Sequence, residues 1–177
     1  MFKRILSIVL TIAYPFVVLI ALKYWGVTAL VGLIVLLCTI QLLTKPSRLS
    51  LFFFAVSLLL SAASFYYQAA LPLKLYPVAV NLVLLCLFTA SLFSEQTAIE
   101  RLARLKDPKL PAEGVRYTRK ITWIWCIFFI INGSIALWTA LLASDETWAL
   151  YNGFIAYILM GILLGGEWLF RRHFLSR

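Results

Sequence analysis

The fold class is decided by residues 120–143, which read KITWIWCIFFIINGSIALWTALLA. After Lys120 this stretch contains no charged residue, and it exceeds the roughly 20 helical residues needed to cross a hydrocarbon core. A strand of a membrane β-barrel would instead alternate polar and apolar residues over about 10 positions. We therefore expect a membrane-spanning helix here.

The composition of the whole chain agrees with this interpretation. Hydrophobic residues make up 63% of the 177 residues and charged residues 13%, whereas soluble domains have about 45–50% and about 25%. The mean hydropathy is +0.96. Too few polar side chains are present to cover so large an apolar surface in water. The sequence therefore predicts an all-α, polytopic integral membrane protein.

Five further apolar runs extend this pattern to both sides of residues 120–143. Together they predict six transmembrane helices in a single domain covering residues 1–177. The predicted spans cover residues 5–22, 25–43, 49–67, 75–93, 120–143 and 148–170. The long polar segment between the fourth and fifth spans, residues 94–119, is the predicted cytoplasmic loop.

Lysine and arginine are distributed unevenly between the two sides that six spans define. Of the 16 basic residues, all but Lys23 and Lys74 lie on the side of the two termini. Because positive charge is retained in the cytoplasm during insertion, both termini are predicted to be cytoplasmic. The net charge of +9 favours anionic lipid headgroups over nucleic acid as the partner, since the basic residues flank apolar runs.

The predicted loop contains a short amphipathic helix over residues 95–105, with Ser94 as its N-cap. Ile99, Leu102 and Leu105 are placed on one face, as in a helix that lies in the headgroup region. The alternative is a solvated connector whose charges only set the topology. The candidate residues for binding headgroups or a protein partner are the basic ones: Arg101, Arg104, Lys106, Lys109, Arg116 and Arg119.

Four polar side chains within the predicted spans are candidate functional residues, because unpaired polar groups are costly in lipid. The side chains of Asn81, Asn132 and Asn152 are predicted to converge on one side of the bundle. There they would either form hydrogen bonds between helices or line a ligand site. Glu167 lies one turn before Arg171, so an ion pair between them is expected. A proton or headgroup site at Glu167 is the alternative.

A GxxxG pattern formed by Gly161 and Gly165 occurs in the last predicted span. Small residues at this spacing let helix backbones approach closely. The pattern predicts packing within the bundle, with homo-oligomerisation as the alternative.

No motif predicts catalysis, a cofactor or a metal site. Cys38, Cys86 and Cys126 are isolated within apolar runs, and His173, the single histidine, lies in a basic tail. This pattern supports neither a disulfide framework nor a zinc site. Nucleotide-binding, dehydrogenase, metalloprotease and serine-hydrolase motifs are absent from the sequence. We therefore expect a protein that is not an enzyme and that has no cofactor.

A series of aromatic and apolar motifs runs from about residue 95 to the end of the chain. They are Ile99-x-Arg101, Leu110-Pro111, an aromatic at Tyr117, Trp125-x-x-Phe128-Phe129 with Gly133, Trp148 at the start of the last span, and Arg172-His173. In these motifs the chain resembles the intracellular septation protein A family of bacterial inner-membrane proteins. It is also similar to uncharacterised inner-membrane proteins that accompany lipid or aryl-polyene biosynthesis genes. Residues 112–116 depart from the family pattern, since the loop looks longer here.

The resemblance implies a protein of the bacterial inner membrane with a role in envelope maintenance, division or lipid assembly, and it supplies no catalytic residue. We therefore expect a non-enzymatic scaffold or accessory factor in envelope biogenesis. Its expected partners are an anionic bilayer and other envelope or lipid-biosynthesis membrane proteins. The alternatives are a small transporter or flippase-like subunit for lipid or acyl products, and a membrane enzyme subunit that acts at the inner leaflet around Glu167.

Overall fold

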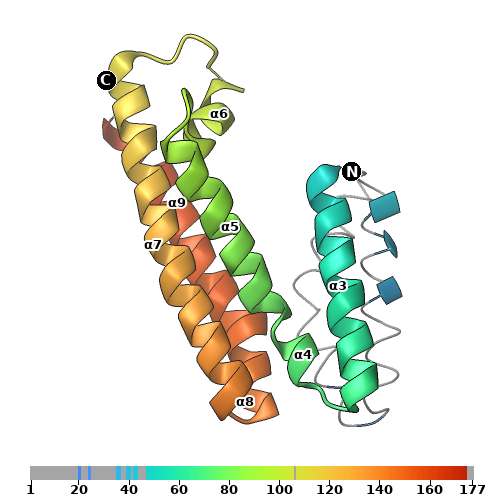
Figure 1. The fold of residues 1–177 in the computed structure, drawn as a ribbon. Helices are drawn as coiled ribbons and strands as arrows, with labels where there is room; N and C mark the ends of the chain where they lie inside the picture. The colour runs from blue at the N-terminus through green and yellow to red at the C-terminus, as the bar shows by residue number, and fades with distance from the viewer. Residues whose placement is uncertain are drawn as a thin grey trace. The chain divides into compact units, whose positions relative to one another are not determined.

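The computed structural model describes residues 47–105 and 107–174, together with Ile20, Tyr24, Val35, Leu36, Thr39, Ile40, Leu42 and Leu43. Apart from those isolated positions, the predicted spans over residues 5–22 and 25–43 lie outside the described residues. In the two continuous ranges all regular structure is helical, as predicted (Figure 1). The elements are α3 (Arg48–Tyr67), α4 (Leu71–Lys74), α5 (Tyr76–Leu92), α6 (Ala98–Arg104), α7 (Ala112–Leu142), α8 (Asp145–Leu150), the π-helix η1 (Tyr151–Ile155) and α9 (Ala156–Phe174).

Four described helical segments are long and apolar enough to cross a membrane. They are Ser50–Tyr67, Leu71–Leu92, Ala112–Leu142 and Asp145–Glu167. These segments coincide with the last four of the six predicted spans, so these four helices are confirmed. The total of six spans and the orientation of the chain remain predictions.

Helix α7 begins at Ala112, eight residues before the predicted fifth span. Residues 112–119, which were expected in the loop, are therefore helical. Pro111 directly precedes the helix, and its carbonyl accepts a hydrogen bond from the backbone N–H of Val115 at 3.0 Å. Glu113 lies in the first turn, where a carboxylate is favoured by the helix dipole.

Helix α6 begins three residues later than expected, and Thr97 rather than Ser94 is its N-cap. The Thr97 hydroxyl accepts a hydrogen bond from the backbone N–H of Glu100 at 3.3 Å. The Ser94 hydroxyl instead donates to the carbonyls of Ser91 and Gln96, and so stabilises the turn after α5.

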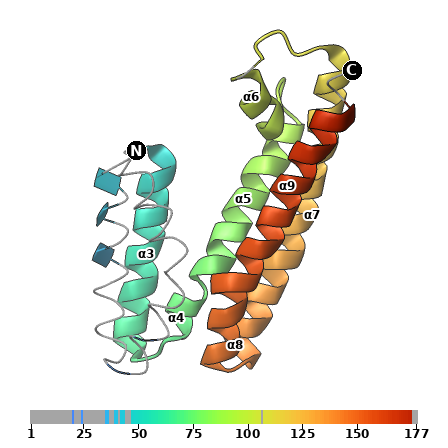
Figure 2. The same ribbon diagram turned by 180° about the vertical axis from the view of Figure 1, so that it is seen from behind.

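The chain divides into two compact units. Unit 2 comprises Asn81–Ser134 and the residues from Leu159 onward, and its parts of α5, α7 and α9 lie side by side (Figures 1 and 2). Its core centres on Ile121, Trp125 and Phe129 of α7. Phe88 of α5 contacts Phe129 edge-to-face, with ring centroids 5.1 Å apart, an arrangement that aromatic pairs favour.

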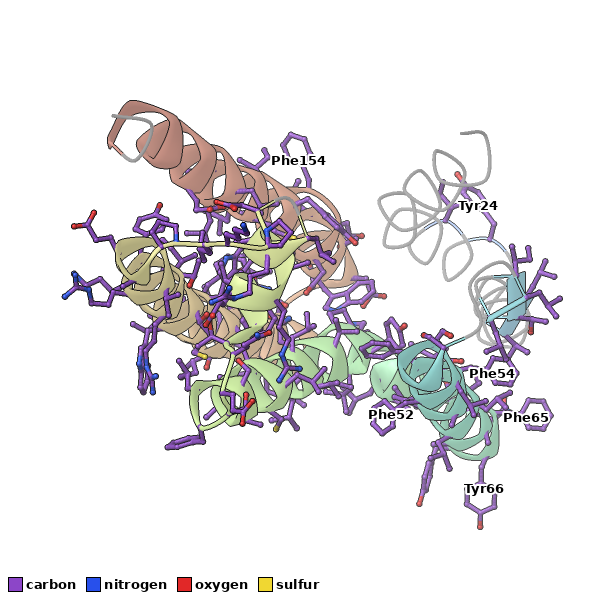
Figure 3. All side chains as sticks on the ribbon, turned by 90° about the horizontal axis from the view of Figure 1, so that it is seen from above. Tyr24, Phe52, Phe54, Phe65, Tyr66 and Phe154 are labelled. Atoms are coloured by element: carbon purple, nitrogen blue, oxygen red, sulfur yellow. The ribbon has the colours of Figure 1, made fainter. Side chains whose placement is uncertain are left out.

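Unit 1 comprises the residues up to Val80 together with Ile135–Ile158. Helix α3 ends at Tyr67, and its C-cap Gln68 adopts a left-handed conformation with φ 49°. The Ser64 hydroxyl donates to the carbonyl of Ala69 and thereby links the end of α3 to the turn before α4. Phe65 and Tyr66 project away from α3, as Figure 3 shows, and are 55% and 80% exposed. Such side chains are compatible with a lipid environment.

Candidate functional site

Three residues of unit 1, which we call the Lys74 cluster, join the end of α4 to the start of α8. They are Lys74, Asp145 and Trp148. Lys74 is 8% exposed, and its Nζ forms an ion pair with the carboxylate of Asp145. The Nε1 of Trp148, whose side chain is fully buried, donates a hydrogen bond to the carbonyl of Lys74 at 3.1 Å. Because a charge removed from water requires a partner, Asp145 fixes the position of the lysine.

The Lys74 cluster is not among the sequence predictions, in which Lys74 counts only as one of the two basic residues opposite the termini. One signal was available in the sequence. Lys74 and Asp145 both lie on the side opposite the termini in the six-span interpretation, where few charges occur. Opposite charges that are scarce on one side of a bundle are candidates for an ion pair.

Asn152 lies in the π-helix η1 and is 6% exposed. Its Nδ2 donates to the Thr139 hydroxyl of α7 at 3.2 Å and to the carbonyl of Trp148 at 2.9 Å. A π-turn widens the helix and displaces the backbone hydrogen bonds. The amide of Asn152 therefore satisfies a backbone carbonyl at this irregularity and ties it to α7.

Asn81 of α5 and Asn132 of α7 are paired in unit 2. The Nδ2 of Asn132 donates to the Oδ1 of Asn81 at 3.0 Å, and the two residues are 5% and 8% exposed. A Cβ at Gly133 would lie 3.1 Å from the Cβ of Asn81, so glycine allows this close approach of the helices. The predicted convergence is therefore found for two asparagines, while Asn152 has the partners given above.

Helix α6 is attached to the rest of unit 2 by buried contacts. Glu100 is 3% exposed, and its carboxylate accepts a hydrogen bond from the Nε of Arg104 at 2.8 Å. The backbone N–H of Ala98 donates to the Ser91 hydroxyl at 2.9 Å, and Ile99 packs against the core centred on Trp125. We call Ser91, Ala98, Ile99, Glu100 and Arg104 the α6 anchor. No pattern in the sequence indicated that Glu100, in a polar loop, would be buried.

The predicted apolar face of α6 is not a single face. Ile99 packs on the core, whereas Leu102 and Leu105 are 59% and 80% exposed. An α-helix turns by about 100° per residue, so residues six apart are separated by about 120° around the axis. The spacing of Ile99 and Leu105 therefore places them on different sides, and the prediction was wrong on this point.

The basic candidates of the loop have different surroundings. Arg104 pairs with Glu100 and also donates to the carbonyl of Pro108 at 3.1 Å. Arg119 donates from Nη2 to the carbonyl of Leu92, the last residue of α5, at 2.7 Å. Arg104 and Arg119 thus form hydrogen bonds within the protein.

The remaining basic candidates lie at the surface or outside the described ranges. Arg101 is exposed and donates to the Ser94 hydroxyl at 3.3 Å. Lys109 and Arg116 are exposed, and Lys106 lies outside the described residues. Arg101, Lys109 and Arg116 therefore present charge at the surface, as does Arg119, which is also exposed.

Two predictions concern α9. Glu167 is half-buried, and the side chain of Arg171 is outside those described, so their ion pair stays a prediction. At Gly161 and Gly165 an added Cβ would have no described neighbour within 4 Å. The described part of the bundle therefore does not pack on this glycine pattern.

In the part of the chain that the structure describes, no three histidine, cysteine or acidic side chains gather into a group that could hold a metal ion. Cys126 is buried, with its Sγ 3.6 Å from the Thr89 hydroxyl, and Cys86 is exposed. Cys38 lies outside the described residues. Comparison of the chain with protein-family models, curated proteins and solved structures finds no match.

Proposed function

We propose that this chain is a multi-pass protein of the bacterial inner membrane, with six spans and both termini in the cytoplasm. In this proposal it is a non-enzymatic scaffold or accessory factor in envelope biogenesis, division or lipid assembly. The observation that carries the proposal is the exposure of large apolar side chains along helices of membrane-spanning length. On α7 alone, Trp123, Ile127, Ile131 and Trp138 are each more than half exposed. A monomeric soluble protein rarely exposes so extensive an apolar surface.

The contacts between α5 and α7 support the proposed topology. Asn81, near the start of α5, pairs with Asn132, near the end of α7, whereas Arg119, near the start of α7, bonds to Leu92 at the end of α5. The two helices are therefore antiparallel, as consecutive crossings of a membrane require. The Lys74–Asp145 ion pair supports placing the turn before α5 and the turn after α7 on the same side.

The state of the buried amides supports a scaffold over a transporter. Asn132 donates to Asn81, and Asn152 donates to Thr139 and to a backbone carbonyl. Interhelical hydrogen bonds of this kind stabilise membrane helices, with about 0.6–2 kcal/mol each. The envelope role extends the resemblance to the septation protein A family, and the proposed partners are anionic lipids and other envelope membrane proteins.

Cysteine accessibility tests the topology. In a chain with Cys38, Cys86 and Cys126 replaced by alanine, new single cysteines are placed at the exposed residues Glu146 and Lys109. A membrane-impermeant maleimide added to spheroplasts should label Glu146→Cys, and it should label Lys109→Cys only after lysis. Labelling of both positions before lysis, or of neither, contradicts the proposal.

Complementation of a deletion strain tests the scaffold role. The double variant Asn81→Leu/Asn132→Leu and the variant Glu167→Gln should restore envelope integrity and division, because neither set of side chains performs chemistry. The double variant Lys109→Glu/Arg116→Glu, at exposed positions, should fail while the protein accumulates normally. If the asparagine double variant and Glu167→Gln fail while the charge reversal restores growth, the scaffold proposal is wrong. A transporter, or an enzyme that uses Glu167, would then be the better explanation.

A further inference from the structure

We propose that the outward side of α6 is a docking surface for an anionic phospholipid membrane. We define this α6 surface as Arg101 and Leu102 of the helix and Leu105, its C-cap. The inference rests on the proposed membrane location and adds that α6 lies in the headgroup layer, with its leucines among the acyl chains and Arg101 at the phosphates.

Helix α6 is held in a defined orientation. Glu100 is buried and ion-paired, Ile99 packs on the aromatic core, and the N–H of Ala98 is bonded to Ser91. A solvated connector has no such attachment. Because the inner side of α6 is fixed by these contacts, the residues on its outer side are presented in a fixed direction.

The outer side of α6 combines apolar side chains with a positive charge. Leu102 and Leu105 are 59% and 80% exposed, although they are large apolar side chains. Arg101 is exposed on the same short helix. An apolar surface with a basic residue beside it is typical of helices that lie in the membrane interface.

The surroundings of α6 favour lipid as the occupant of this surface. Helix α5 exposes the large apolar side chains of Leu82 and Leu87, at 59% and 48%, and Phe93, which directly follows it, is 84% exposed. The proposed function places these side chains in the bilayer, on the segment that leads to α6. Trp123 of α7 is 53% exposed, and tryptophan prefers the headgroup level of a membrane. Six basic and four acidic residues within 94–119 give this region a charge complementary to anionic headgroups.

Depth measurements with spin labels test the inference. Single cysteines at Leu102 and Leu105 are labelled in the cysteine-free chain, and the protein is placed in nanodiscs of phosphatidylcholine alone or with phosphatidylglycerol. Accessibility to oxygen, which partitions into lipid, is compared with accessibility to a nickel chelate, which stays in water. The matched controls are Ile127 on the exposed face of α7 and Glu113, exposed at the start of α7.

Leu102 and Leu105 should resemble Ile127, with an oxygen-to-nickel accessibility ratio several-fold above that of Glu113, and the ratio should rise when phosphatidylglycerol is present. Arg101→Gln should remove most of that rise. If Ile127 reports lipid while both leucines report water, the α6 inference is wrong and the membrane proposal stands. If the leucines are shielded from both reagents, a protein contact covers them, and the inference is also wrong. If Ile127 itself reports water, the proposed membrane location fails first.

Discussion

The Lys74 cluster and the α6 anchor each contain one ion pair, but the two pairs are built differently. Glu100 and Arg104 are one helical turn apart, so any helix through these residues brings them together. Lys74 and Asp145 are brought together only by the folding of α4 against α8. The first pair is a local feature that tertiary packing has buried, whereas the second exists only in the folded bundle.

The pairs share one property that determines how they respond to mutation. In each, one partner is buried and the other reaches solvent: the side chains of Lys74 and Asp145 are 11% and 48% exposed, and those of Glu100 and Arg104 are 4% and 29% exposed. A charge left buried without its partner is costly, whereas a charge near the surface can be hydrated. Removing the more exposed partner should therefore be the more damaging change in both regions.

The largest effect is expected at Trp148, which has no exposed surface and donates to the carbonyl of Lys74. Trp148→Ala removes a large buried side chain and should lower the free energy of unfolding by about 3–5 kcal/mol. Trp148→Phe keeps most of the ring and should cost about 1–3 kcal/mol through the lost hydrogen bond. Unfolding in mixed detergent micelles measures both values, and a Trp148→Phe cost close to zero would show that the indole N–H contributes nothing.

The next effect separates the two members of the Lys74–Asp145 pair. Asp145→Asn leaves the buried ammonium of Lys74 without a countercharge and should cost about 1–3 kcal/mol. Lys74→Met leaves a half-exposed carboxylate that water can solvate, so the cost should be below about 1 kcal/mol. The double variant should be close to Lys74→Met alone. The same unfolding assay measures all three, and the reverse order of the single variants would contradict the asymmetry.

The α6 anchor should show the same asymmetry with a smaller range. Arg104→Met leaves the buried carboxylate of Glu100 without its ion-pair partner and should cost about 1–2 kcal/mol. Glu100→Gln keeps a hydrogen-bond acceptor and should cost under about 1 kcal/mol. Since α6 is a small element, hydrogen exchange of residues 98–104 is the appropriate measurement. Faster exchange in Glu100→Gln than in Arg104→Met would be the opposite result.

The contrast between local and tertiary features also explains what could be predicted from the sequence. The helices α3 and α5 were predicted almost to their ends, since a continuous apolar run is a local property that length and composition report. The start of α7 could not be predicted from hydropathy, because residues 112–119 are polar. A polar segment is typical of a loop, but polarity does not exclude a helix.

Some polar contacts could likewise be predicted from the sequence, and others could not. The depth of Asn81 and Asn132 in their spans was sufficient to predict that they meet, because antiparallel helices place early residues of one beside late residues of the other. Asn152 depends on a π-helix, which shifts the register of its side chain and which no pattern in the sequence indicated. The burial of Glu100 requires knowing that α6 folds back on the core, and this information is tertiary.

The smallest predicted effect compares the helix caps beside the two ion pairs. Thr97 caps α6 through the N–H of Glu100 and is 2% exposed, whereas Ser144 caps α8 through the N–H of Thr147 and is exposed. Loss of an N-cap typically costs about 1 kcal/mol. Thr97→Ala should reach or exceed this value, since the freed N–H is buried, while Ser144→Ala should cost about 0.5 kcal/mol because water replaces the hydroxyl. Hydrogen exchange at Glu100 and Thr147 reports the two caps separately. If Ser144→Ala proves the more costly, solvent access does not determine the energetics of these two regions, and the asymmetry argued for the ion pairs loses its basis.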